Sequence, residues 1–171
     1  MLTRLRGGLA ALTDSEQRPL RPVGCSVREA AARTGVLLAR LREMPGVRVC
    51  DGVRVGTDGP PLGFAVTAGA LVLLVESVAW PAGAYRTGPD GRVFCDDLYI
   101  GQSVRPLMES ARRLRGSLPD RHRVGAVIVV HPYGPGPATL PAPAAGAPAW
   151  LRPGDAAGFF AARLRRPAAG R

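Results

Sequence analysis

The chain has 171 residues, and its 23 basic and 13 acidic residues give a formal net charge of +10. All 23 basic residues are arginine, and the sequence contains neither lysine nor asparagine. The absence of lysine excludes every mechanism that needs a lysine ammonium group, such as a Walker-type phosphate-binding loop or a Schiff base. Because a GC-rich genome also favours arginine, the charge alone does not identify an acidic partner.

The length suits one domain of common size with a hydrophobic core of its own. Hydrophobic residues make up 46% of the chain and aromatic residues only 5%, so valine, leucine and alanine must fill most of that core. The three cysteines, Cys25, Cys50 and Cys95, form no CxxC pair. This spacing favours reduced thiols in a cytoplasmic protein over a zinc site or a disulfide scaffold.

The chain is predicted to begin with a weakly ordered arm over residues 1–24, where prolines discourage a helix. Ser26 and Glu29 have the spacing of a capping box, which marks the start of a helix. We expect this helix to run to about Met44, because a Pro-Gly pair follows directly. A folded α/β domain is expected to extend from here over residues 25–131.

Alternating apolar and polar residues over Val47–Val55 predict a half-buried strand. Residues 62–80 carry a single charge, Glu76, and allow two interpretations. They can form a buried hairpin over Phe64–Trp80 that turns near Gly69. Alternatively, they can anchor the chain in a membrane as a helix, which would place Glu76 inside the bilayer at a cost of a few kcal/mol. We favour the hairpin.

The second half of the chain alternates periodic apolar segments with turns. The acidic pair Asp96 and Asp97 suits a turn, because adjacent residues of a strand point to opposite faces. Residues 132–153 hold seven prolines and three glycines, which predicts a long irregular loop. The other elements expected here are short strands at Ala84–Arg86 and Arg92–Cys95, a helix over Ser103–Leu118, a buried strand over Val124–Val130, a helix over 154–166 and a tail over 167–171.

The segment around Glu76 resembles a known family. Leu73–Trp80, followed by Pro81–Tyr85, is similar to the signature strand of the nuclease-related domain (NERD) family, in which a hydrophobic strand ends in an acidic-x-Lys triplet. Glu29 and the helix from Gln102 through Pro106 and Ala111 to Leu114 also resemble that family. The resemblance implies a three-layer restriction-endonuclease-like core, a mixed sheet flanked by helices in the order α-β-β-β-α-β-α. It also implies metal-dependent cleavage or processing of DNA.

Sites of this kind hold a divalent metal between carboxylates, and a lysine two residues after the second carboxylate stabilises charge at the phosphate. The resemblance places Glu76 at the carboxylate position and Val78 at the lysine position. The family's first acidic residue falls near Gly63, for which Asp51 is a substitute, and Glu29 is a further carboxylate. We therefore expect a degenerate site with no cofactor, or Mg²⁺ held by Glu76 and Asp51 if the site is intact.

Arginine is densest over the second predicted helix and the loop after it. Such a face suits contacts with the phosphates of double-stranded DNA, with an affinity that falls as salt rises. A solvated arginine face without a partner is the alternative. On a helical wheel Arg105, Arg112 and Arg115 are close neighbours. The same dense stretch also contains Arg113, Arg121 and Arg123.

The sequence leaves three functions open. We expect a catalytically degenerate NERD-like domain that binds nucleic acid or a protein partner. The first alternative is an active metal-dependent nuclease that uses Glu76 with Asp51 or Glu29, and the second is a small membrane-associated protein anchored by residues 62–80. Glu76 also has a purely structural interpretation, in which it pairs with an arginine or points past the sheet edge. His131 is interpreted as structural rather than as a general base.

Overall fold

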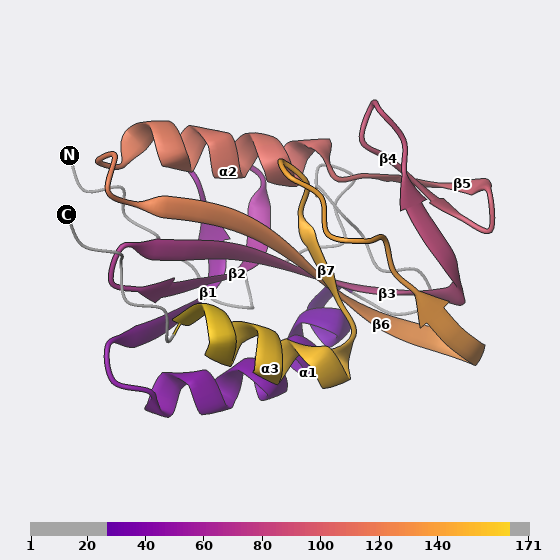
Figure 1. Ribbon diagram of the computed structural model, residues 1–171, viewed down its shortest axis with the longest axis horizontal. Helices are drawn as coiled ribbons and strands as arrows, with labels where there is room; N and C mark the ends of the chain where they lie inside the picture. Colours follow the sequence, from indigo (N-terminus) through magenta and orange to yellow (C-terminus); the bar gives the residue numbers. More distant parts are fainter. Residues whose placement is uncertain (1–26, 165–171) are drawn as a thin grey trace.

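The computed structural model describes residues 27–164, so the predicted arm, Cys25, Ser26 of the predicted capping box and the predicted tail lie outside the described residues. The described part is a mixed α/β structure in which helices surround a sheet, as predicted (Figure 1). Its elements in chain order are α1 (Val27–Ala39), the 3-10 helix η2 (Arg40–Glu43), β1 (Val47–Arg54), β2 (Pro61–Ala68), β3 (Leu71–Thr87), β4 (Arg92–Cys95), β5 (Leu98–Ser103), α2 (Arg105–Ser117), β6 (Arg123–Thr139), β7 (Ala149–Leu151) and α3 (Pro153–Leu164).

The sheet combines antiparallel and parallel pairs. β1, β2 and β3 form an antiparallel meander, while β3 pairs in parallel with β6 and β6 pairs in parallel with β7. A parallel pair needs a long connection, and α2 lies in the connection between β3 and β6. The β4–β5 hairpin pairs with the distal part of β3, beyond the meander (Figure 1).

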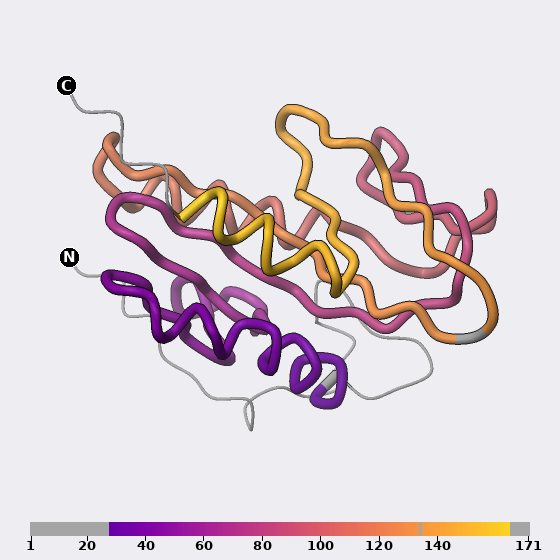
Figure 2. The backbone as a smooth tube through the Cα atoms, turned by 60° about the horizontal axis from the view of Figure 1, so that its bottom comes forward, coloured from indigo at the N-terminus to yellow at the C-terminus, as the bar shows by residue number. Residues whose placement is uncertain are grey.

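Helices cover both faces of the sheet. α2 lies on one face, and α1 and α3 lie next to each other on the opposite face (Figure 2). Side chains alternate along β3, so Leu74 faces the core layer that includes Leu107 of α2, while Leu73 faces the layer that includes Leu38 of α1 and Phe160 of α3. Burial on both faces explains the nearly continuous apolar sequence of β3.

Residues 62–80 form the predicted hairpin. β2 and β3 are antiparallel, with Ala68 opposite Leu71, and Gly69 in the turn has a φ of 55°. Such a φ suits glycine, which carries no Cβ. None of the helices between residues 27 and 164 is long and apolar enough to cross a membrane.

Two strands are longer than the sequence predicted. β3 continues from the hairpin to Thr87, so the separate short strand expected at Ala84–Arg86 is its distal end. β6 continues to Thr139 through three prolines, so the loop expected over 132–153 is wrong for most of its length. On its other edge β6 pairs with β7 over Val127–Val129, and the prolines beyond have no partner strand there within residues 27–164. Proline, which lacks a backbone N–H donor, is tolerated at such an edge.

The predicted turn at Asp96 and Asp97 is confirmed, with φ values of 47° and 67°. These two residues join the paired Cys95 and Leu98, and two positive φ angles are typical of a type I′ hairpin turn. The strand that follows, β5, was not predicted. Gln102 therefore lies on β5, buried, and not at the start of α2.

Candidate functional site

The three carboxylates of the predicted metal site lie in three separate environments. Glu29 is exposed on α1 and forms an ion pair with Arg33 at 2.7 Å. Asp51 on β1 accepts two hydrogen bonds from Nη2 of Arg42, at 2.7 and 2.9 Å. Glu76 is fully buried in β3. Among the described residues, no group of three or more histidine, cysteine or acidic side chains is arranged so that it could hold a metal ion.

Glu76 of β3 accepts a hydrogen bond from the backbone of β2. The pairing of these two strands ends at Phe64 and Val75. Gly63 on β2 and Glu76 on β3 are the next residues beyond this pair. At this point the backbone N–H of Gly63 donates to Oε1 of Glu76 at 2.7 Å. The Glu76 carboxylate therefore replaces a backbone acceptor where the strand pairing stops. Glu76 is fully buried, so it does not point past the sheet edge as one structural interpretation expected; its contact with the Gly63 backbone is structural but was not predicted.

The positions that the resemblance assigns to the other catalytic groups have no room for them. Val78 is fully buried in the core layer on the α2 side of the sheet. A Cβ atom on Gly63 would lie 3.1 Å from the backbone oxygen of Val75, so a larger side chain would require the strands to shift. Neither a lysine nor an aspartate fits these positions without rearrangement.

His131 links the sheet to α1. Its Nε2 lies 2.8 Å from the hydroxyl oxygen of Thr34, and both side chains are buried. Burial lowers the pKa of His131, and the nearby charge of Arg33 lowers it further. The neutral ring therefore joins two layers of the fold, which agrees with its structural interpretation. Ser77, also buried, has a hydroxyl with no hydrogen-bond partner in the described part of the chain.

α2 places arginines on its exposed side because its apolar side faces the sheet. Leu107, Ala111 and Leu114 are buried, whereas the arginines are exposed. Arg105 lies 3.6 Å from Glu109. The others form no ion pair with any described residue. We use the name basic surface for Arg112, Arg113, Arg115, Arg121 and Arg123.

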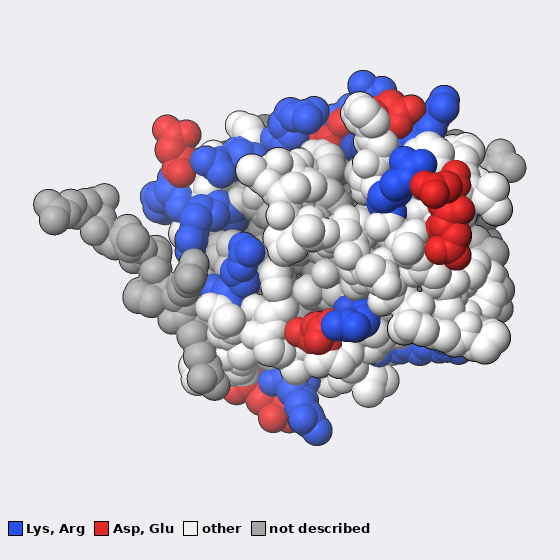
Figure 3. Space-filling model, turned by 45° about the vertical axis from the view of Figure 1, so that its right-hand side comes forward, with Lys and Arg blue, Asp and Glu red and all other residues white. Residues whose placement is uncertain are grey.

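The basic surface occupies the end of the molecule where α2 ends. Figure 3 shows arginine side chains gathered at this end, with little acidic surface among them. Asp120 is the single carboxylate in the sequence between residues 112 and 123. Arg123 also lines a small hollow of about 120 Å³, together with Arg163 near the end of α3. The positive charge therefore continues onto the neighbouring layer.

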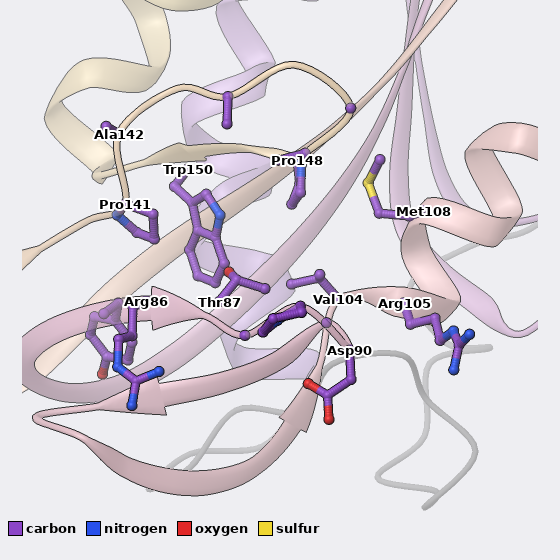
Figure 4. Close-up of a pocket in the computed structure, with 17 residues that line it drawn as sticks. Arg86, Thr87, Asp90, Val104, Arg105, Met108, Pro141, Ala142, Pro148 and Trp150 are labelled. Carbon is purple, nitrogen blue, oxygen red and sulfur yellow. The ribbon is translucent and has the colours of Figure 1, made fainter.

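A cleft of about 600 Å³ lies at the opposite end of α2. The distal part of β3, the first turn of α2 and the segment 141–150 enclose it (Figure 4). Trp150 lies in its wall and contacts the buried Trp80, with ring centroids 5.9 Å apart. Trp80 in turn stacks on Tyr85 at 5.5 Å. Burial raises the pKa of the Tyr85 hydroxyl, and the neighbouring Cys95 adds to this rise.

No pattern in the sequence indicates the cleft, because its walls come from segments that are far apart in the chain. Trp150 fell in a predicted loop, and the one available signal was a tryptophan in a proline-rich stretch of a chain poor in aromatic residues.

Comparison with models of known protein families, with curated proteins and with solved structures gives no match for this chain. The similarity to the NERD family therefore depends on the residues quoted above.

Proposed function

We propose that the protein is a NERD-like domain that binds duplex nucleic acid through the basic surface and does not cleave it. The basic surface carries this proposal. Its five arginines are exposed, lie on α2, in the loop after it and at the start of β6, and form no ion pair with the described carboxylates. Guanidinium groups that pair with no carboxylate of the described residues are available to phosphates, which they bind with paired N–H donors.

The arrangement of the elements supports a restriction-endonuclease-like core. A helix, a three-stranded antiparallel meander, a second helix and a parallel strand follow one another along the chain. Helices lie on both faces of the mixed sheet. The β4–β5 hairpin before α2 and the strand β7 before α3 are additional to the order expected from the resemblance.

The environment of the predicted catalytic residues supports loss of cleavage. Mg²⁺ requires several oxygen ligands at one point in space. Asp51 is engaged by Arg42, and Glu29 lies on an exposed helix surface beside Arg33. Glu76 already accepts a backbone hydrogen bond inside the sheet. These residues do not fit a shared metal, and we derive no catalytic step from them.

The proposal predicts a salt-dependent affinity. When the logarithm of the binding constant is plotted against the logarithm of the salt concentration, each phosphate neutralised by an arginine contributes about −0.9 to the slope. Removing three contacts should therefore make the slope less steep by about 2.7, provided that all three arginines bind phosphates. The affinity should depend little on base sequence, because contacts with phosphates do not read bases.

The test compares two triple variants that lose the same charge. One carries Arg112→Ala, Arg113→Ala and Arg115→Ala. The control removes three exposed arginines from α1, η2 and β1 that also lack ion pairs with described residues; these are Arg28, Arg40 and Arg48. Fluorescence anisotropy with a labelled blunt duplex, measured over a range of salt concentrations, reports both the affinity and the slope.

We expect the first variant to lose at least tenfold in affinity at low salt and the control to lose much less. Equal losses would show a general effect of net charge, and no binding by the parent protein at low salt would reject the proposal. Plasmid incubated with Mg²⁺ or Mn²⁺ should stay intact. Cleavage that disappears with Glu76→Gln would establish the nuclease alternative instead.

A further inference from the structure

The cleft next to α2 has the dimensions of a ligand site. Its volume of about 600 Å³ lies within the range of roughly 300–1,000 Å³ that is usual for small-molecule pockets. Its floor includes Tyr85–Thr87 of β3, whose pairing with β6 ends at Ala84 and Thr139. Beyond this pair the chain turns away as the segment 141–148, which forms the opposite wall. The divergence of β3 and β6 therefore creates the cleft.

The middle of the cleft is apolar and aromatic. Figure 4 shows the Trp150 ring extending into the cavity between Pro141 and Pro148, with Val104 and Met108 on the other side. Trp150 is partly exposed, although its contact with the fully buried Trp80 holds the ring in place. A fixed, accessible indole is a suitable surface for stacking a planar ring.

The two ends of the cleft carry positive charge. Arg86 and Arg105 lie at opposite ends of the view in Figure 4. Arg86 is held in position by Asp97 at 2.9 Å and by the Phe94 ring, whose centroid is 4.1 Å from the guanidinium carbon. Arg105 is largely exposed, and its contact with Glu109 is long, at 3.6 Å.

One carboxylate, Asp90, also lines the cleft. It forms an ion pair with Arg92 at 3.0 Å, outside the cavity lining, so its charge is already compensated. The ion pair with Asp97 occupies Nε of Arg86 and leaves its two Nη groups for a phosphate. The cleft therefore offers an aromatic centre between two guanidinium groups. A planar ring with a negative charge on each side complements this arrangement, and an unpaired nucleotide within a strand is such a ligand.

The cleft and the basic surface share α2. Arg105 precedes Arg112 by seven residues, which is close to two helical turns or about 10 Å along the axis, so both lie on the same side of the helix. If a nucleic acid binds along α2, the phosphates that follow those at the basic surface would therefore lie at the mouth of the cleft.

We propose that the cleft receives an unpaired nucleotide at the end of a bound duplex, with the base against Trp150 and the flanking phosphates at Arg86 and Arg105. The nature of this ligand rests on the proposed function, whereas the cleft and its lining do not. The protein would accordingly prefer a duplex with a single-stranded end over a blunt duplex.

The experiment compares a blunt duplex with the same duplex carrying a short oligothymidine overhang at one end. We expect the overhang to strengthen binding by about tenfold, which is within the range of one base–aromatic contact. Trp150→Leu should remove this advantage and leave the affinity for the blunt duplex unchanged. Tyr99→Leu, which removes an exposed aromatic residue outside the cleft, should retain the advantage.

A second measurement uses the unmodified protein and so does not depend on a variant that folds. Trp80 is fully buried, so acrylamide quenching of tryptophan fluorescence reports mainly on Trp150. The overhang duplex, and not the blunt duplex, should protect this fluorescence.

The outcomes separate the two proposals. An overhang that neither strengthens binding nor protects Trp150, while the blunt duplex still binds, would overturn the cleft proposal alone. An equal loss for both duplexes with Trp150→Leu would also overturn it. A single-stranded oligothymidine that protects Trp150 when the blunt duplex does not bind would support the cleft and reject the duplex-binding function.

Discussion

Acidification should destabilise the protein through His131. Its ring is only 7% exposed and lies between β6 and α1, where Thr34 contacts Nε2. Burial and the charge of Arg33 both lower its pKa in the folded state, whereas the unfolded chain has an ordinary histidine pKa of about 6.5. As the pH falls below this value, the unfolded state takes up a proton before the folded state does. The free energy of unfolding must therefore decrease.

The size of this effect follows from the linkage relation. If the folded state binds no proton at His131, lowering the pH from about 7 to about 5.5 reduces the free energy of unfolding by about 1.3 kcal/mol. This is an upper limit, and it is reached only when the pKa in the folded state lies well below 5.5. Urea unfolding at several pH values, followed by circular dichroism, measures it directly.

Three glutamine variants isolate the contribution of His131. His131→Gln keeps a polar group near Thr34 but does not titrate, so its stability should change less over this pH range. His122→Gln, in the turn before β6, should behave as the parent protein does. Arg33→Gln should make the pH dependence shallower, because the charge that disfavours the protonated ring is removed. A His131→Gln profile that coincides with that of the parent would refute the reasoning.

Three further predictions concern the sheet and its turns. Val78→Lys should lower the free energy of unfolding by about 3–5 kcal/mol, because it buries an uncompensated charge, and it should not confer cleavage. Val36→Lys, at a residue that is 75% exposed, should change stability very little, and thermal unfolding compares the two variants. Gly63→Ala should cost roughly 1–3 kcal/mol in urea unfolding, since its Cβ would crowd the Val75 backbone, and an unchanged midpoint would contradict this. Asp97→Gly should raise the melting temperature slightly, because glycine adopts positive φ without strain; a lower value would show that the ion pair with Arg86 matters more.

The elements predicted well from the sequence are those that local pattern determines. The β2–β3 hairpin and strand Arg92–Cys95 were found because apolar runs end at turn residues. α2 begins at Arg105 and ends at Ser117, within two residues of the prediction, because its apolar side repeats at helical spacing and Pro119 follows. In each case the signal lies within the segment itself.

The elements that the sequence did not predict depend on distant partners. The strand at 132–139 is rich in proline and exists because β3 lies beside it and pairs with it. β5 pairs only with β4, and exposed Leu98 and Tyr99 give it no regular alternation. The cleft requires β3, α2 and Trp150 together. No local pattern carries information of this kind, because it arises from packing between segments far apart in the chain.

Val78 connects the composition of the chain to its proposed function. The sequence shows that no lysine is present, and the structure places valine at the matching position inside an apolar core layer. A lysine introduced there would lose the packing of Val78 and bury its charge, so this substitution alone would not create a catalytic site. Glu76 has a separate reason to persist, since it accepts the Gly63 N–H where the strands separate. Because Glu76 has this structural contact, its presence alone is a poor indicator of nuclease activity.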